Sequence, residues 1–72
     1  MIASIRDLAI SLAIWVHANP EYTMNEALVE VARSERVALS RVQYALTFAQ
    51  SEYWVDIEGD HLLPGPVTAP AR

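Results

Sequence analysis

Arginines form the group of side chains best suited to molecular recognition in this sequence. Arg33, Arg36 and Arg41 fall within nine residues of one another, and the chain has no lysine. A guanidinium can hold a phosphate oxygen or pair through two hydrogen bonds with a carboxylate or a guanine edge. Nine carboxylates give a formal net charge of −4, and four of them fall in residues 52–60. The sequence therefore predicts a surface with one cationic face and one anionic face, which excludes polyanion binding over the whole surface.

Side chains that would support catalysis or metal binding are sparse. His17 and His61 are the only histidines, cysteine is absent, and no phosphate-binding glycine loop or zinc pattern occurs. The acidic run Asp56–His61 lacks the spacing of a calcium loop, since its glycine is fourth and an isoleucine is second. We therefore expect no enzyme activity, no cofactor and no metal site. The absence of cysteine favours a reducing, cytoplasmic location.

The elements that would position these side chains begin with a helix over residues 2–18. Apolar residues there recur at the three- and four-residue spacing of one helical face, and Asn19-Pro20 ends the pattern. Ile10 and Ile14 fall on another side of the helix, where either the hairpin and tail cover them or a second copy of the chain does. The apolar run Leu8–Val16 is too short to span a bilayer, so we expect no membrane segment.

A second helix is predicted to start near Met24, because Thr23–Glu26 matches the capping-box pattern of threonine followed three residues later by glutamate. Ser34-Glu35-Arg36 interrupts the apolar rhythm, which resumes in a third helix over Ala38–Gln50. No glycine or proline lies between Tyr22 and Glu58. The alternative is therefore one long helix from Met24 to Tyr53, packed on the first as a helical hairpin.

The last regular element is a predicted β-hairpin. Apolar and polar residues alternate from Tyr53 to Glu58, Gly59 centres a turn, and His61-Leu62-Leu63 forms the return strand. A hairpin this small needs a helix layer or a third strand, which the step at Tyr22 would supply. Three prolines follow within seven residues. We expect one domain over residues 1–63 and a Pro-rich disordered tail over residues 64–72.

Helix, short strand, helix, turn, helix and hairpin is an order of elements that resembles the winged helix-turn-helix superfamily. Thr23–Ala32 is similar to the second helix of that superfamily, Ala38–Leu46 to its third, and Trp54–Leu63 to its wing. The resemblance implies a mainly α fold with a small β-hairpin; the alternatives are an α-helical hairpin or a three-helix domain. The turn here lacks the glycine that many helix-turn-helix motifs carry.

The resemblance also implies a function. In that superfamily the third helix usually enters the major groove of double-stranded DNA, where its outward side chains read base edges. By position, the chain would be a small transcriptional regulator, and we expect it to be a homodimer joined through Ile10 and Ile14. The residues carried over as DNA contacts are Arg33, Arg36, Ser40, Arg41, Gln43, Tyr44 and Thr47.

A protein-binding role is the alternative function. An acidic wing would be repelled by phosphates, and Tyr44 and Phe48 lie one turn apart on the third helix. Aromatic pairs of this kind often anchor protein interfaces, although Phe48 has a second possible position beneath the hairpin. On this interpretation the chain is a small adaptor or inhibitor that binds its protein partner through Tyr44, Phe48 and the acidic hairpin.

Overall fold

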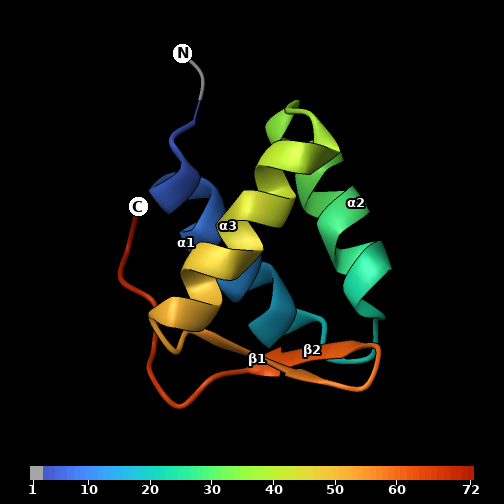
Figure 1. Ribbon diagram of the computed structural model, residues 1–72, viewed down its shortest axis with the longest axis vertical. Helices are drawn as coiled ribbons and strands as arrows, with labels where there is room; N and C mark the ends of the chain where they lie inside the picture. The colour runs from blue at the N-terminus through green and yellow to red at the C-terminus, as the bar shows by residue number, and fades with distance from the viewer. Residues whose placement is uncertain (1–2) are drawn as a thin grey trace.

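The computed structural model describes residues 3–72, which form three helices followed by a two-stranded antiparallel hairpin (Figure 1). The elements are α1 (Ile5–Ala18), α2 (Met24–Glu35), α3 (Leu39–Ser51), β1 (Val55–Glu58) and β2 (His61–Pro64). The predicted mainly α fold with a small β-hairpin is confirmed, in a topology like that of a winged helix. The alternative of one helix from Met24 to Tyr53 is wrong, because α2 ends at Glu35.

Local sequence determines where the first two helices begin. The Ser4 hydroxyl accepts a 3.0 Å hydrogen bond from the Asp7 amide and caps α1. The predicted capping box of α2 is complete: the Thr23 hydroxyl accepts from the Glu26 amide, and the Glu26 carboxylate accepts from the Thr23 amide at 3.0 Å. Each cap satisfies amides that would otherwise lack an intrahelical acceptor.

The break between α2 and α3 depends on one backbone conformation. Arg36 is left-handed, with φ 55°, and the amide of Val37 reaches back to the carbonyl of Ala32 at 3.1 Å. This is the hydrogen-bond pattern with which a left-handed residue closes a helix, a position usually taken by glycine. Arg36 therefore replaces the glycine that the sequence lacks.

The hairpin closes through a two-residue turn. Glu58 pairs with His61, and Val55 pairs with Pro64 at the far end. Gly59 has φ 63°, whereas Asp60 has no positive φ, which matches a type II′ turn. A single bridge between Thr23 and His61 adds a short third strand beside β2, one residue beyond the predicted step at Tyr22. The hairpin is thus tied to the start of α2.

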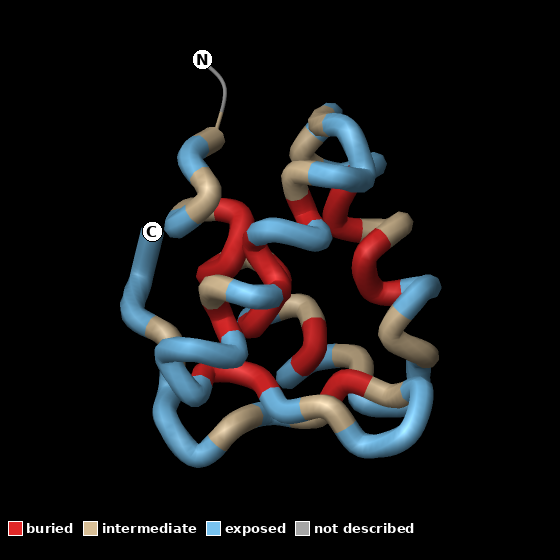
Figure 2. Tube along the Cα trace, in the orientation of Figure 1, coloured by how far each residue is buried: buried red, intermediate tan, exposed pale blue. Residues whose placement is uncertain are grey.

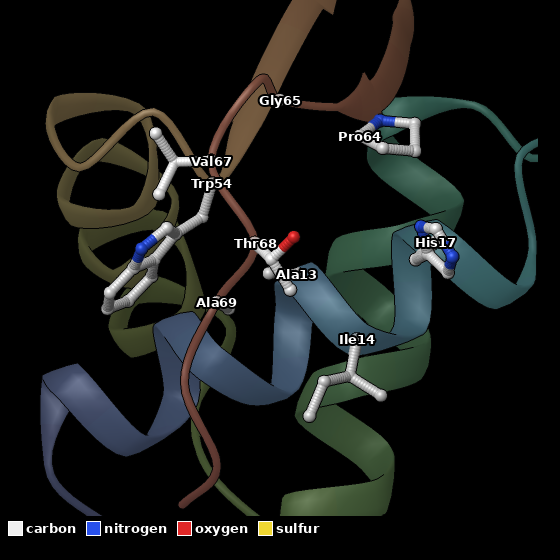
Figure 3. Close-up of a pocket in the computed structure, with 9 residues that line it drawn as sticks. All are labelled: Ala13, Ile14, His17, Trp54, Pro64, Gly65, Val67, Thr68 and Ala69. Carbon is white, nitrogen blue, oxygen red and sulfur yellow. The ribbon is translucent and has the colours of Figure 1, made fainter.

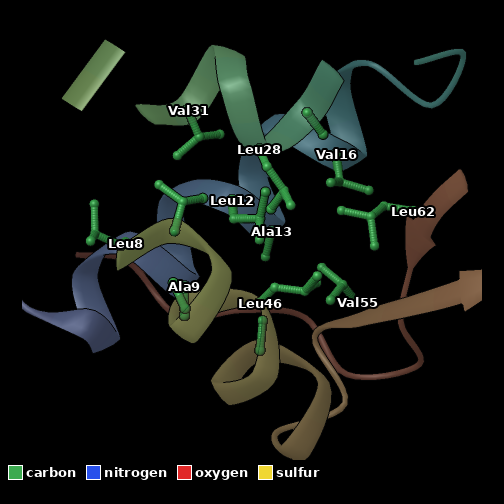
Figure 4. Close-up of a cluster of buried hydrophobic side chains, with 14 of the residues drawn as sticks. Leu8, Ala9, Leu12, Ala13, Val16, Leu28, Val31, Leu46, Val55 and Leu62 are labelled. Carbon is green, nitrogen blue, oxygen red and sulfur yellow. The ribbon is translucent and has the colours of Figure 1, made fainter. Parts of the chain in front are cut away.

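The hydrophobic core surrounds α1, which packs most extensively on α3 and also contacts α2 and β2. Figure 2 shows buried segments of all three helices facing one another, and Figure 4 shows side chains from the helices and both strands meeting around α1. Ile10 is fully buried, so its predicted role in self-association is wrong. A helix enclosed by several elements buries more than one stripe. Ile14, by contrast, is 55% exposed.

Residues 65–72, here called the strap, are bound to the domain. The Gly65 amide donates to the Trp54 carbonyl at 2.9 Å, and the Val67 amide donates to the Tyr53 carbonyl at 3.0 Å. At the other end, Arg72 Nη1 donates to Ser11 Oγ and Glu35 Oε2, both at 2.7 Å. The strap has no regular secondary structure and bends at Pro66 and Val67, but these contacts fix both of its ends, so the prediction of a disordered tail from Pro64 is wrong. Pro64 itself ends β2.

Candidate nucleic-acid interface

The outward face of α3 carries neutral hydrogen-bonding side chains. Ser40, Gln43, Tyr44 and Thr47 are all exposed and line a shallow depression of about 270 Å³. Tyr44 is 70% exposed. The opposite face of the same helix is buried in the core through Val42, Ala45, Leu46 and Ala49. Because the buried face fixes the rotation of α3, these four predicted contact residues are brought together on one surface.

The amino-terminal end of α3 is left uncapped. Its N-cap residue is Ala38, which provides no side-chain acceptor, and its first turn contains no acidic residue. The caps of α1 and α2 come from Ser4 and Thr23, and both of those helices have an acidic residue in the first turn. The free amides and the helix dipole make the start of α3 attractive to an anion.

The three predicted arginines adjoin this helix end. Arg36 occupies the left-handed position and is exposed, and Arg41 is half-buried in the first turn of α3. Arg33 lies in the last turn of α2, with its side chain 73% exposed and 3.2 Å from Glu30 Oε1. An exposed ion pair of this kind contributes at most about 1 kcal/mol, so Arg33 remains available to another anion.

The hairpin has the opposite charge. Asp56, Glu58 and Asp60 are exposed, and β1 is the outer strand of the sheet. His61 Nε2 lies 3.3 Å from Asp60 Oδ1, which makes one partial ion pair at the turn. These carboxylates would be strongly repelled by DNA phosphates if the hairpin lay beside the DNA backbone. The described residues therefore concentrate positive charge at the α2–α3 turn and negative charge at the wing.

Phe48 does not share the outward face with Tyr44. It is half-buried, and its ring lies 5.8 Å from that of Trp54 at an angle of 52°. A tilted aromatic contact of this geometry is favourable and belongs to the packing of the hairpin on α3. The position beneath the hairpin is thus the one that Phe48 occupies, and within residues 3–72 Tyr44 has no aromatic contact.

Shifted pKa values occur away from the α3 face. Hydrogen bonds from the Thr23 backbone and then from its hydroxyl lower the pKa of Glu26. The hydrogen bond to Glu35 raises the pKa of Arg72. Within residues 3–72, no group of three histidine, cysteine, aspartate or glutamate side chains is arranged to hold a metal ion. No helix in the same residues has the length and hydrophobicity needed to cross a membrane.

Comparisons of the chain with models of protein families, with curated proteins and with solved structures give no match. The interpretation of the site therefore depends on its own geometry. The sequence-based prediction identified the side chains on this face but missed the open amides at the start of α3. The signal was present, because Ala38 stands where serine, threonine or aspartate would usually cap the helix.

Proposed function

We propose that this chain is a small DNA-binding transcriptional regulator that inserts α3 into the major groove. The observation that carries the proposal is the uncapped start of α3, which combines free amides with Arg33, Arg36 and Arg41. Amides at a helix start and guanidinium groups are both good phosphate ligands. The exposed hydrogen-bonding face of α3 begins at this end of the helix and continues along it to Thr47.

The outward face of α3 would recognise the DNA sequence. Arg41 can pair with the two acceptors of guanine and Gln43 with adenine, while Tyr44 and Thr47 offer further hydroxyl groups. In this arrangement the acidic wing stays away from the phosphates, so α3 and the turn before it make the contact by themselves. Two copies bound to adjacent half-sites would double this limited contact with DNA. Because Ile10 is buried in the core, only Ile14 of the two predicted interface residues on α1 is exposed for contact with a second copy.

The electrostatics lead us to expect a weak, salt-dependent interaction. Three arginines that each neutralise one phosphate give a slope of log affinity against log salt of about −2.7. The formal net charge of −4 opposes approach from any other side. We place this function in the cytoplasm, the compartment favoured by the absence of cysteine.

The test is a fluorescence-anisotropy titration of mixed-sequence duplex DNA at low and moderate salt. Arg36→Ala and Arg41→Ala should each weaken binding about tenfold, since each loses a charged hydrogen bond. Arg6→Ala is the matched control, because Arg6 is exposed in the first turn of α1 and its removal changes the net charge equally. An equal loss with Arg6→Ala, or no binding of wild type at low salt, would refute the proposal.

One observation favours the protein-binding alternative. Tyr44 projects from the middle of α3 with 70% of its surface exposed, and exposed tyrosines are common anchors of protein interfaces. If wild type binds no duplex even at low salt, this alternative becomes the better account of the same face.

A further inference from the structure

A hollow lies between α1 and the strap, on a different part of the molecule from the α3 face (Figure 3). Its volume is about 230 Å³. Three of its lining residues come from α1 and four from the strap, and Trp54 and Pro64 complete it. The full set is Ala13, Ile14, His17, Trp54, Pro64, Gly65, Val67, Thr68 and Ala69.

The strap that forms one wall of the hollow is hydrogen-bonded to the domain near its two ends. Backbone hydrogen bonds at Gly65 and Val67 fix its start, and Arg72 fixes its end to Ser11 and Glu35. Small side chains, Ala13 and Ala69, line the space between these anchors.

The lining indicates what kind of molecule would fit. The walls are mainly apolar, and no carboxylate or guanidinium lines them. Two polar side chains, those of His17 and Thr68, also line the hollow and make no hydrogen bond within residues 3–72. An apolar body would bury the exposed parts of Ile14 and Val67, and one polar group would replace water as the hydrogen-bond partner of the exposed Thr68 hydroxyl or His17 imidazole.

We infer that this hollow is a binding site for a small, neutral, mainly apolar molecule with one hydrogen-bonding group. A macromolecular partner is a poorer match. Of the large apolar side chains exposed in the described residues, only Ile14 and Val67 line the hollow, and a stable protein interface buries about 800 Å² on each side. This site is independent of the proposed DNA binding, and either can fail without the other.

The test uses benzyl alcohol as the probe and toluene as the probe that lacks the hydroxyl group. Titrations followed by amide and indole NMR shifts should saturate with a dissociation constant on the order of 1 mM, because a ligand of this size has few atoms to contribute binding free energy. The shifts should be confined to residues 13–17, Trp54 and residues 65–69. Trp54 emission, measured in a Trp15→Phe background, gives an independent readout of the same binding.

Two variants assign the binding to the hollow. Thr68→Val keeps the volume of the side chain and removes its hydroxyl group. The variant should therefore weaken the binding of benzyl alcohol about fivefold and leave the binding of toluene unchanged. Ala69→Leu fills the space and should weaken both probes at least about tenfold, as expected for a lost pocket. If Ala69→Leu does not fold, Thr68→Leu at the exposed neighbouring position fills the space instead.

Three results would overturn the inference. The shifts fail to saturate, or they saturate equally in the filled variant, or light scattering shows a dimer that Ile14→Asp converts to a monomer. The last result would assign this face to a second copy of the chain.

Discussion

Replacing Gly65 by alanine should detach the strap. A Cβ atom at this position would lie 2.2 Å from the Tyr53 carbonyl oxygen and 2.8 Å from the Trp54 carbonyl carbon. Both neighbours are backbone atoms at the junction of α3 and β1, and neither can rotate aside. The strap must therefore move away from this junction, which breaks the hydrogen bonds of Gly65 and Val67.

The expected cost follows from these contacts. Two backbone hydrogen bonds contribute about 1 kcal/mol each, and Trp54, now 8% exposed, loses part of its cover. Alanine returns up to about 1 kcal/mol by restricting the unfolded chain. We expect a net loss of about 2 kcal/mol, which for a domain of this size lowers the melting temperature by roughly 8–16 °C. Deletion of residues 65–72 gives the upper bound of this loss of stability, since the deletion removes every contact of the strap.

The assay combines urea unfolding with amide hydrogen exchange, and Gly59→Ala is the matched control. Gly59 has φ 63° at the first central position of the type II′ turn and nothing within 4 Å of an added Cβ, so alanine there costs about 1–3 kcal/mol through backbone strain alone. Exchange at the Val67 amide should accelerate in Gly65→Ala and stay slow in Gly59→Ala. A Gly65→Ala protein with wild-type stability and a protected Val67 amide would show that the strap is not held as described.

Three further predictions concern stability. Arg36→Gly should stabilise the domain by up to about 1 kcal/mol in urea unfolding, because it removes a left-handed non-glycine residue; a loss of stability would contradict the role of this turn. The lowered pKa of Glu26 means that its ionised form stabilises the fold at neutral pH and that this contribution is lost as pH falls through about 4.3 towards the lower folded value. Glu26→Gln should therefore flatten the acid side of the stability curve, and an unchanged acid slope would exclude this group as its source. Ile10→Ala should cost about 2–5 kcal/mol and Ile14→Ala under about 1, measured by thermal unfolding; equal costs would contradict their burial.

Local signals in the sequence predicted most of the secondary structure. The Thr23–Glu26 capping box, the proline at position 20 and the alternation before Gly59 each act over a few residues, so they can be interpreted without knowledge of distant contacts. The outward face of α3 was also predictable, because the buried positions of one helix determine its exposed ones. These features define both the fold class and the candidate interface.

The errors arose where distant segments meet. Ile10 looks like part of an outer strip on an isolated helix and becomes buried because α1 has neighbours on several sides. The prolines of the strap exclude regular structure, but they do not reveal that its amides find the carbonyls of Tyr53 and Trp54. The left-handed conformation of Arg36 is a local feature, but no glycine marks it, so the sequence predicted the break at residues 34–36 without this conformation.

The central position of α1 has a consequence for biosynthesis. Among the described elements this helix is synthesised before the others, yet its principal partner is α3, which is completed only at Ser51. Until then its apolar surface has no full cover, and α2 alone does not enclose it. Pairings between segments far apart in the chain slow folding, and the waiting intermediate exposes an aggregation-prone surface. Assembly of this domain therefore cannot be completed until the hairpin and the strap have also been made and have packed against the helices.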